Sequence, residues 1–239
     1  MALLDLLVNG IVGTYFSTEI PFFILCYLLC ILVAYCLGSI NFAIILSKVR
    51  HGDDIRRHGS GNAGMTNMLR TYGKTDGLLT LLGDALKTAL AIFIGMILVG
   101  SAHGGNYAGG LFAILGHIFP CYYGFKGGKG VVASAMTILM LNPKVAGLLI
   151  LTFVVVVAIW RYISLGSVVC AMLYPMLTYA MTNVAYKGPS TLFALVIAII
   201  VIVLHKDNIV RLLNGKESKL SFGKKNEKKT YTVKKEKKK

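Results

Sequence analysis

The stretch IPFFILCYLLCILVAYCLGSINFAIIL runs from residue 20 to residue 46 without a charged side chain. A helix that crosses a hydrocarbon core of about 30 Å needs roughly 20 apolar residues, so this stretch is long enough to span a membrane. The whole chain agrees, since 56% of its 239 residues are hydrophobic, 15% are charged and the mean hydropathy is +0.70. These values exclude an ordinary soluble globular protein and indicate an integral membrane protein.

Further apolar stretches follow, and together they predict about seven membrane helices. The candidate helices are residues 20–46, 75–100, 108–122, 129–142, 144–160, 163–182 and 190–205. The third and fourth are short for full spans, so they either cross the membrane or form a re-entrant pair that enters it and returns. The sequence therefore predicts an all-α, polytopic membrane protein with one membrane-embedded domain, residues 1–217.

The Lys and Arg residues between the predicted helices fall mostly on one side of the membrane. Of the 25 basic residues, 22 lie on that side, Lys144 and Lys187 lie on the other, and Lys87 lies inside the second helix. By the positive-inside rule, the N-terminus is outside and the C-terminus is cytoplasmic. No basic region precedes the first helix, so we expect no cleavable signal peptide. The sequence predicts a multi-pass protein of the cytoplasmic membrane, with its polar motifs facing the cytoplasm.

The C-terminal end is basic and low in complexity. Residues 206–239 carry 13 of the 25 basic side chains, and the whole chain has a net charge of +15. No aromatic-interleaved basic face accompanies this charge, so we expect no nucleic-acid partner. We expect residues 218–239 to be a disordered cytoplasmic tail near anionic lipid. The five cysteines show no paired pattern and are interpreted as packing residues.

Two glycine-rich segments are similar to nucleotide-binding motifs without matching them. HGSGNAG at 58–64 contains G-x-G-x-x-G, but a membrane helix follows it and no βαβ unit surrounds it. FKGGKG at 125–130 departs from a Walker A loop, because Gly130 stands where Ser or Thr would bind magnesium. Both segments keep closely spaced glycine amides, beside predicted helix starts at Met65 and Gly128. These features favour phosphate binding.

Cationic and polar side chains accompany these glycines. Lys126 and Lys129 add two ammonium donors to the second segment, which suits a phosphate group. The alternative is that both lysines only anchor a turn on the cytoplasmic side. The density of glycine favours the phosphate site, since an anchor needs no glycines. In the first segment, Asn67 and Arg70 lie three apart and would share a helical face.

Ionisable residues also occur within the predicted membrane helices. Asp84 and Lys87 lie three apart in the second one, where charges are costly unless they are paired or face a cavity. An ion pair within the helix is the simplest interpretation. His117 is either a packing residue that bonds a carbonyl or a group that touches substrate.

The end of the seventh predicted helix carries a further set of polar residues. His205, Asn208 and Arg211 recur every three residues along one helical face, and Glu217 follows a glycine that favours a helix end. A solvated helix end is the usual explanation of such a run. Its position on the same side of the membrane as the glycine-rich segments argues for a shared site.

Taken together, the motifs resemble one enzyme family. They are GSIN at 38–41, GSGNAGMTNMLR at 59–70, GDALKT at 83–88, GHIFP at 116–120, FKGGKGVVAS at 125–134, RYISLGS at 161–167 and HKDNIVRLLNGKE at 205–217. In this order and spacing they closely resemble the bacterial acyl-phosphate:glycerol-3-phosphate acyltransferases, the PlsY family. The resemblance covers roughly residues 20–217.

The resemblance implies a seven-helix inner-membrane enzyme of phospholipid synthesis that needs no cofactor and no metal. It implies transfer of a fatty acyl group from acyl phosphate, made by an upstream enzyme, to the 1-hydroxyl of glycerol 3-phosphate. The products would be lysophosphatidate and phosphate. The implied catalytic residues are Ser60, Arg70, Lys129 and His205. The implied substrate-binding residues are Asn62, Asn67, His117, Lys126, Gly127, Gly128, Asn208 and Glu217.

Four positions depart from the family pattern, and none removes a charge from the implied site. Asn41 stands where the family usually has proline, Met65 where it has alanine and Thr88 where it has glycine. Ala133 stands where threonine is common, with Ser134 beside it. No hydroxyl acts at position 133, therefore, unless Ser134 substitutes for it.

An acyl phosphate already carries a good leaving group, so we expect direct attack by the glycerol hydroxyl without an acyl-enzyme. The absence of a G-x-S-x-G motif agrees with this. The proton acceptor is either His205 or a phosphate oxygen of a bound substrate. A transporter or channel for an organic phosphate anion and a membrane scaffold are the alternative functions. The sequence does not determine the acyl-chain preference or the oligomeric state.

Overall fold

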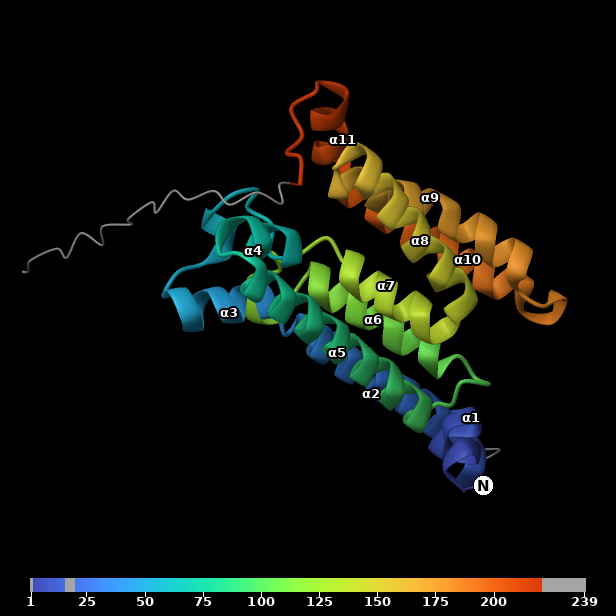
Figure 1. Ribbon diagram of the computed structural model, residues 1–239. Coiled ribbons are helices and arrows are strands. Elements are labelled where there is room, and N and C mark those ends of the chain that lie inside the picture. The colour runs from blue at the N-terminus through green and yellow to red at the C-terminus, as the bar shows by residue number, and fades with distance from the viewer. Residues whose placement is uncertain (1, 16–19, 221–239) are drawn as a thin grey trace, which may run out of the picture.

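The computed structural model describes residues 2–15 and 20–220, and all the regular structure in these ranges is helical (Figure 1). The α-helices are α1 (Ala2–Tyr15), α2 (Ile20–Ser39), α3 (Phe42–His51), α4 (Met65–Thr71), α5 (Lys74–Leu98), α6 (Gly105–Ile118), α7 (Val131–Leu141), α8 (Pro143–Trp160), α9 (Ile163–Met181), α10 (Val184–Leu204) and α11 (Lys206–Leu213). Two short 3₁₀ turns, Ile55–Arg57 and Cys121–Tyr123, lie in the connections.

Five segments of the described ranges are long and apolar enough to cross a membrane. They are Ile20–His51, Lys74–Leu98, Pro143–Trp160, Ile163–Met181 and Val184–Leu204. The helices α6 and α7 have only 14 and 11 residues. Each of the seven predicted stretches contains a helix, and the membrane class of the protein is confirmed, but only five of these helices have the length of a full span.

The long helices form two groups joined by α7. In one group α2, α5 and α6 pack against one another, and in the other α9 packs against α8 and α10. Helix α7 contacts α5 and α6 on one side and α8 on the other (Figure 1). Helices α2 and α6 approach closely because Gly38 and Gly116 lie at their contact, where a Cβ on either would overlap the backbone of the other helix. Such glycines are the usual means of close packing between membrane helices.

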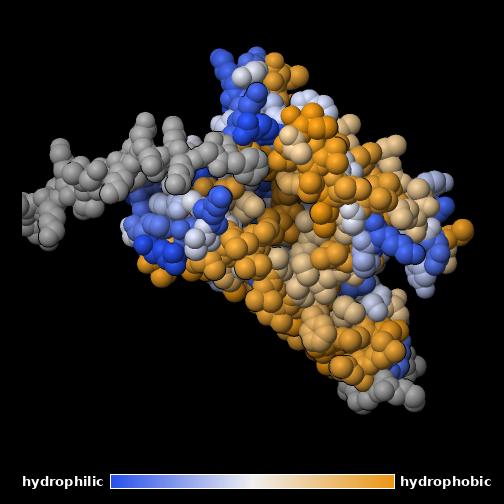
Figure 2. Space-filling model, in the orientation of Figure 1, coloured by the Kyte–Doolittle hydropathy of each residue, from blue (hydrophilic) through white to orange (hydrophobic). Residues whose placement is uncertain are grey.

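The surface divides into an apolar body and polar ends. Figure 2 shows hydrophobic residues over most of the visible bundle, while hydrophilic residues gather around α3, α4 and α11. Large apolar side chains are exposed on the outer helices, among them Leu28 of α2, Leu86 of α5 and Leu151 of α8. Apolar side chains that are exposed along whole helices indicate contact with lipid rather than water. The end formed by α3, α4 and α11 is therefore an aqueous end.

The first apolar stretch is not one helix over 20–46, as predicted, because it breaks at Ile40 and Asn41. The Asn41 side chain caps the start of α3 by accepting a hydrogen bond from Ile44 N at 3.1 Å. The Ile40 carbonyl at the break accepts a hydrogen bond from Lys87 Nζ at 2.6 Å. A helix breaks within a membrane only where other groups satisfy its backbone. Here the N-cap preference of asparagine and a buried lysine do so.

Other boundaries also differ from the expectations. Helix α1 was not predicted, and α7 begins at Val131 rather than near Gly128, because Gly130 before it adopts a left-handed φ of 75°. The helix expected near Met65 is confirmed as α4. The expected tail boundary lies inside a packed segment, since Leu220 N donates to the Arg161 carbonyl at 2.6 Å. The rest of the expected tail, 221–239, lies outside the described residues.

Candidate active site

The predicted site residues come from four parts of the chain that meet at the aqueous end. They are the loop 58–64 with α4, the glycine-lysine loop 124–130, the junction of α10 and α11, and the segment after α11. Within the described residues, direct hydrogen bonds link members of all four parts. We describe these links first, because they decide which polar atoms are available to a substrate.

Glu217 joins α9 to α11. Its Oε1 accepts hydrogen bonds from Ser164 Oγ at 2.9 Å and from Asn208 Nδ2 at 2.8 Å, and its Oε2 accepts one from Arg211 Nε at 2.8 Å. The side chain is 3% exposed. Burial on its own raises the pKa of Glu217, but the three hydrogen bonds outweigh it and hold the pKa below the ordinary value. The carboxylate is thus ionised, and it orders this end of the bundle.

Asn208 links the Glu217 carboxylate to Lys129 through hydrogen bonds. The Lys129 ammonium donates a hydrogen bond to Asn208 Oδ1, while Asn208 Nδ2 donates to Glu217. The two contacts require opposite atoms of the amide, so they fix which way the Asn208 side chain faces. Burial, with a smaller contribution from Arg211, lowers the pKa of Lys129. No second partner of Lys129 Nζ is found among the described residues, so it retains N–H donors for a bound anion.

Arg70 reaches the same region from α4. Its Nη2 donates a hydrogen bond to the Ser218 carbonyl at 2.9 Å, and its charge lies close enough to interact with Arg211 and Glu217. The site therefore contains the cations Arg70, Lys129 and Arg211, with one buried carboxylate. Such an excess of positive charge suits a phosphate dianion better than a neutral ligand.

His205 lies buried at the junction of α10 and α11. Its Nδ1 is 2.7 Å from the Val201 carbonyl. A carbonyl only accepts hydrogen bonds, so Nδ1 carries the proton and Nε2 keeps a free lone pair. Burial, more than any other influence, lowers the pKa of His205 below its ordinary value. The imidazole is therefore neutral at pH 7, and Nε2 is able to accept a proton.

Both polar atoms of the Asn67 side chain are hydrogen-bonded to the backbone of its own loop. Asn67 is 2% exposed, its Oδ1 accepts a hydrogen bond from Ser60 N at 3.1 Å, and its Nδ2 donates to the carbonyls of His58 at 2.9 Å and Asn62 at 3.0 Å. In the structure the Asn67 amide thus holds the backbone of its own loop, and the predicted contact with substrate stays a prediction. Ser60 lies exposed at the loop tip that Asn67 holds.

The glycine-lysine loop also differs from the expected phosphate cradle. The N–H groups of Gly127 and Gly128, predicted to face phosphate, donate to the carbonyls of Ile118 and His117, each at 3.1 Å. A Cβ at Gly127 would overlap the His117 carbonyl, and one at Gly128 would overlap the His117 ring. These two glycines permit close packing, so the loop offers Lys129 to a ligand rather than their amides.

Arg56 connects the glycine-lysine loop to the loop before α4. Its Nη1 donates to the carbonyls of Tyr123 at 2.8 Å and Lys126 at 3.2 Å, while Asp54 accepts from the same guanidinium at 2.7 Å. The Lys126 side chain is exposed. The structure brings Arg70, Lys129, His205, Asn208 and Glu217 together, and it places Ser60, Asn62 and Lys126 on the two loops that Arg56 joins.

Sequence reasoning missed Ser164, Arg56 and the contact role of Arg211. Ser164 stands in RYISLGS, a quoted motif to which no site residue was assigned. Arg211 was placed on the helical face of Asn208 without a partner. Ser164 and Arg211 both donate hydrogen bonds to the carboxylate of Glu217, which lies on a separate segment, so neither contact is visible in a local sequence pattern.

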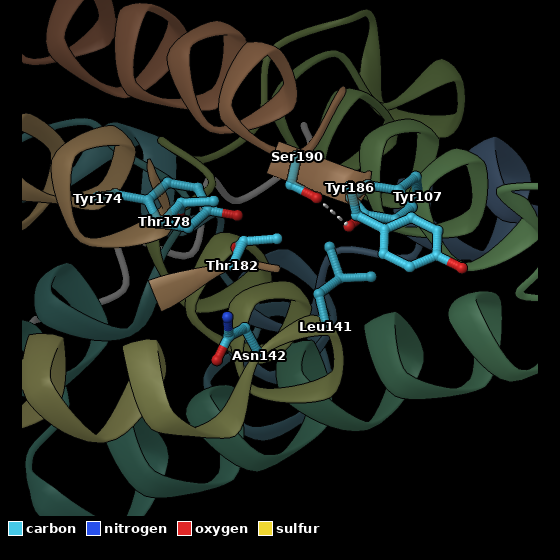
Figure 3. Close-up of a pocket in the computed structure, with 8 residues that line it drawn as sticks. All are labelled: Tyr107, Leu141, Asn142, Tyr174, Thr178, Thr182, Tyr186 and Ser190. Carbon is cyan, nitrogen blue, oxygen red and sulfur yellow. Dashed lines mark hydrogen bonds between the residues drawn. The ribbon is translucent and has the colours of Figure 1, made fainter. Parts of the chain in front are cut away.

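One cavity lies far from these residues, toward the opposite ends of α9 and α10. It measures about 190 Å3 and is lined by Tyr107, Leu141, Asn142, Tyr174, Thr178, Thr182, Tyr186 and Ser190 (Figure 3). The Tyr107 and Ser190 hydroxyls are hydrogen-bonded at 2.9 Å across it. The lining carries no charged side chain and no predicted site residue. This cavity is therefore separate from the cationic site, and among the described residues no group of three His, Cys, Asp or Glu is placed to hold a metal ion.

Comparison with known proteins finds similar proteins of one family. The profile of the glycerol-3-phosphate acyltransferase family matches residues 28–215. Glycerol-3-phosphate acyltransferases of Syntrophomonas wolfei and Clostridioides difficile are 40% and 41% identical to the chain, over 80% and 81% of its length and 95% of theirs.

Two solved structures also match. The crystal structure of PlsY, an integral membrane glycerol 3-phosphate acyltransferase, in its glycerol 3-phosphate form has a TM-score of 0.75 at 33% identity, covering 82% of this chain and 96% of that one. Its lysophosphatidic acid form has a TM-score of 0.73 at 32% identity, covering 82% of this chain and 95% of the other. Fold and sequence thus agree on the relatives.

Proposed function

The chain belongs to the glycerol-3-phosphate acyltransferase family, and on this basis we propose that it takes its acyl group from acyl phosphate. The acyl group passes to the 1-hydroxyl of glycerol 3-phosphate, and lysophosphatidate and phosphate are released. The observation that carries the proposal is the cationic site, in which Lys129 and Arg70 stand beside the Glu217 carboxylate. Both substrates are phosphorylated, and PlsY has been solved in a glycerol 3-phosphate form and a lysophosphatidic acid form.

The reaction needs no covalent intermediate on the protein. The hydroxyl oxygen of glycerol 3-phosphate bonds to the acyl carbon, and the bond from that carbon to the phosphate oxygen breaks. Lys129 and Arg70 hold the departing phosphate, and Ser60 on its exposed loop contacts the developing oxyanion. We propose His205 Nε2 as the acceptor of the hydroxyl proton, because the Val201 carbonyl holds the proton of this imidazole on Nδ1. The competing acceptor is a phosphate oxygen of a bound substrate.

The remaining residues act in support. Asn208 and Glu217 orient Lys129, Asn67 holds the Ser60 loop, and Gly127 and Gly128 allow the glycine-lysine loop to pack on His117. We propose that Asn62 and Lys126, on the two neighbouring loops, contact the substrates. No cofactor takes part in this scheme.

The membrane arrangement is part of the proposal. We propose seven crossings, with α6 and α7 as short spans inside the bundle, the N-terminus outside and the site facing the cytoplasm across the cytoplasmic membrane. The concentration of basic residues on the loops next to the site supports this orientation. Residues 1–217 form the catalytic domain, and the basic segment 218–239 follows it, beginning with Ser218 and Leu220, which bond to Arg70 and Arg161. An enzyme that makes acyl phosphate supplies the donor from the cytoplasmic side.

Purified protein in detergent tests the reaction directly. With labelled glycerol 3-phosphate and an acyl phosphate, we expect labelled lysophosphatidate and one phosphate released per acyl group transferred. With acyl-CoA in place of acyl phosphate we expect no product. Transfer from acyl-CoA would refute the proposed donor. Uptake of labelled glycerol 3-phosphate into proteoliposomes that contain no acyl donor would instead support a transporter.

A further inference from the structure

A buried cluster of three ionisable side chains lies beneath the glycine-lysine loop. Asp84 and Lys87 of α5 and His117 of α6 have side chains that are 1%, 3% and 4% exposed. Charged groups at such a depth are costly unless their partners are complete. The contacts of this cluster therefore determine what each group does.

The Lys87 ammonium has three N–H bonds and three acceptors. Lys87 Nζ lies 2.9 Å from Asp84 Oδ1, 2.6 Å from the Ile40 carbonyl and 3.1 Å from His117 Nδ1. The first partner neutralises the charge, and the second satisfies the backbone where the first membrane helix breaks. The third contact reaches across to α6 and is not needed for either purpose.

That third contact decides the tautomer of His117. An ammonium group only donates hydrogen bonds, so His117 Nδ1 must accept with its lone pair. The proton of the neutral imidazole then resides on Nε2. If the imidazole were doubly protonated, its Nδ1–H would point at the ammonium. The repulsion between these two donors opposes that state.

The protonated Nε2 edge of His117 meets the glycine-lysine loop. A Cβ at Gly128 would overlap Nε2, and the Gly128 N–H donates to the His117 carbonyl at 3.1 Å. Gly128 directly precedes Lys129, the lysine of the cationic site. The ring thus stands beneath the loop that carries this lysine, with an N–H donor directed at it.

We propose that Asp84 and Lys87 are positioning residues, which hold His117 in the Nε2–H tautomer so that it presents a fixed N–H donor to a phosphoryl oxygen at the glycine-lysine loop. This inference rests on the proposed function for the identity of the ligand. The reverse tautomer would turn a lone pair toward that oxygen, and the attraction would become repulsion. The intramembrane ion pair thereby acts on the site through one histidine.

The competing interpretation is that the pair only satisfies the break at Ile40. The two interpretations differ at His117, because Asp84 Oδ1 lies 3.5 Å from His117 Nδ1. When Lys87 is replaced by methionine, this carboxylate becomes the nearest partner of Nδ1, and it is an acceptor. We therefore expect Nδ1 to gain a proton in Lys87→Met. The variant Lys87→Arg keeps a charged donor and serves as the matched control.

Nitrogen-15 NMR of histidine-labelled protein in detergent distinguishes the two tautomers. The His117 signals are assigned by their loss in His117→Gln. We expect an unprotonated Nδ1 in the wild type and in Lys87→Arg, and a protonated Nδ1 in Lys87→Met. A wild-type spectrum with Nδ1 protonated would overturn the inference even if no variant folds. So would an Nδ1 that stays unprotonated in Lys87→Met.

Acyl-transfer kinetics test whether Lys87 acts through His117. We expect Lys87→Met to lower kcat/KM about 10- to 100-fold, the range seen when the residue that orients a functional histidine is lost. We expect the double variant His117→Ala/Lys87→Met to be no slower than His117→Ala, because the second change then has no target. Additive losses would show that Lys87 acts elsewhere and overturn the inference. A wild-type protein without transfer activity would refute the proposed function, whereas the tautomer measurement does not depend on it.

Discussion

Glutamine in place of Glu217 tests the carboxylate that orders the cationic site. The change keeps the size of the side chain, removes its charge and replaces one acceptor oxygen by an N–H donor. Three donors converge on this carboxylate, from Ser164, Asn208 and Arg211. In Glu217→Gln at least one of them faces another donor and loses its hydrogen bond.

The contacts set the size of the effect. Arg211 is 41% exposed and can turn to water, so its ion pair contributes only about 0–1 kcal/mol. Ser164 is buried and Asn208 half-buried, and a donor left without an acceptor there costs about 1–3 kcal/mol. Together these values predict a loss of about 1–4 kcal/mol in the free energy of unfolding. In a domain of this size each kcal/mol lowers the unfolding midpoint by about 2–4 °C.

Thermal unfolding in detergent measures this loss. We expect the midpoint of Glu217→Gln to fall by about 2–16 °C, and acyl transfer to fall with it, because Lys129 loses its orientation through Asn208. Asp207→Asn is the matched control, since it removes an exposed carboxylate from the neighbouring helix α11 and should leave the midpoint nearly unchanged. Equal midpoints for Glu217→Gln and the wild type would refute the reasoning.

Acidification provides a second readout of the same group. The folded state holds the pKa of Glu217 below its ordinary value of about 4.3, so its stabilisation is complete above that pH. It is lost as the pH falls from there through the lower folded value. The midpoint of the wild type should therefore fall more steeply than that of Glu217→Gln below about pH 4.3. Parallel curves would contradict an ionised, hydrogen-bonded carboxylate.

Three further predictions concern activity. Lys129→Met should lower kcat/KM by about 10²- to 10³-fold without a large change in the unfolding midpoint, because the transition state loses one charged donor. Lys126 is exposed, so Lys126→Met should lower kcat/KM much less. Equal losses of kcat/KM in the two variants would contradict the special role of Lys129. Because burial lowers the pKa of His205, the wild-type kcat/KM should stay constant as the pH falls to about 6.5 and decline only below that pH. The pH–rate profile of His205→Ala should lack this decline. A decline that begins above about pH 6.5, or near-normal turnover of His205→Ala, would exclude His205 as the base. Gly128→Ala should lower the free energy of unfolding by about 1–3 kcal/mol and also slow the transfer, because its Cβ overlaps the His117 ring. A variant with the wild-type unfolding midpoint and the wild-type rate would contradict that packing.

Polar atoms at the site show where prediction from sequence ends. Glycine spacing predicted the location of the glycine-lysine loop, yet Gly127 and Gly128 direct their amides to the carbonyls of Ile118 and His117. Asn67 was expected to touch substrate, and its amide bonds the backbone of its own loop. In both cases the residue type indicated that a hydrogen bond or a close approach was needed, but it did not indicate which group would be the partner.

By itself the sequence determined that this protein is helical and lies in a membrane, because an apolar stretch as long as 20–46 has no other stable surroundings. Its motifs also identified the family, and they predicted five of the residues that the fold brings together at the aqueous end, Arg70, Lys129, His205, Asn208 and Glu217. Only the tertiary structure decided that the first stretch breaks at Ile40, and that Glu217 gathers Ser164, Asn208 and Arg211. The reason is that each of these features depends on hydrogen-bond partners that the fold brings from other helices or from beyond a helix end, which no local pattern of residues contains.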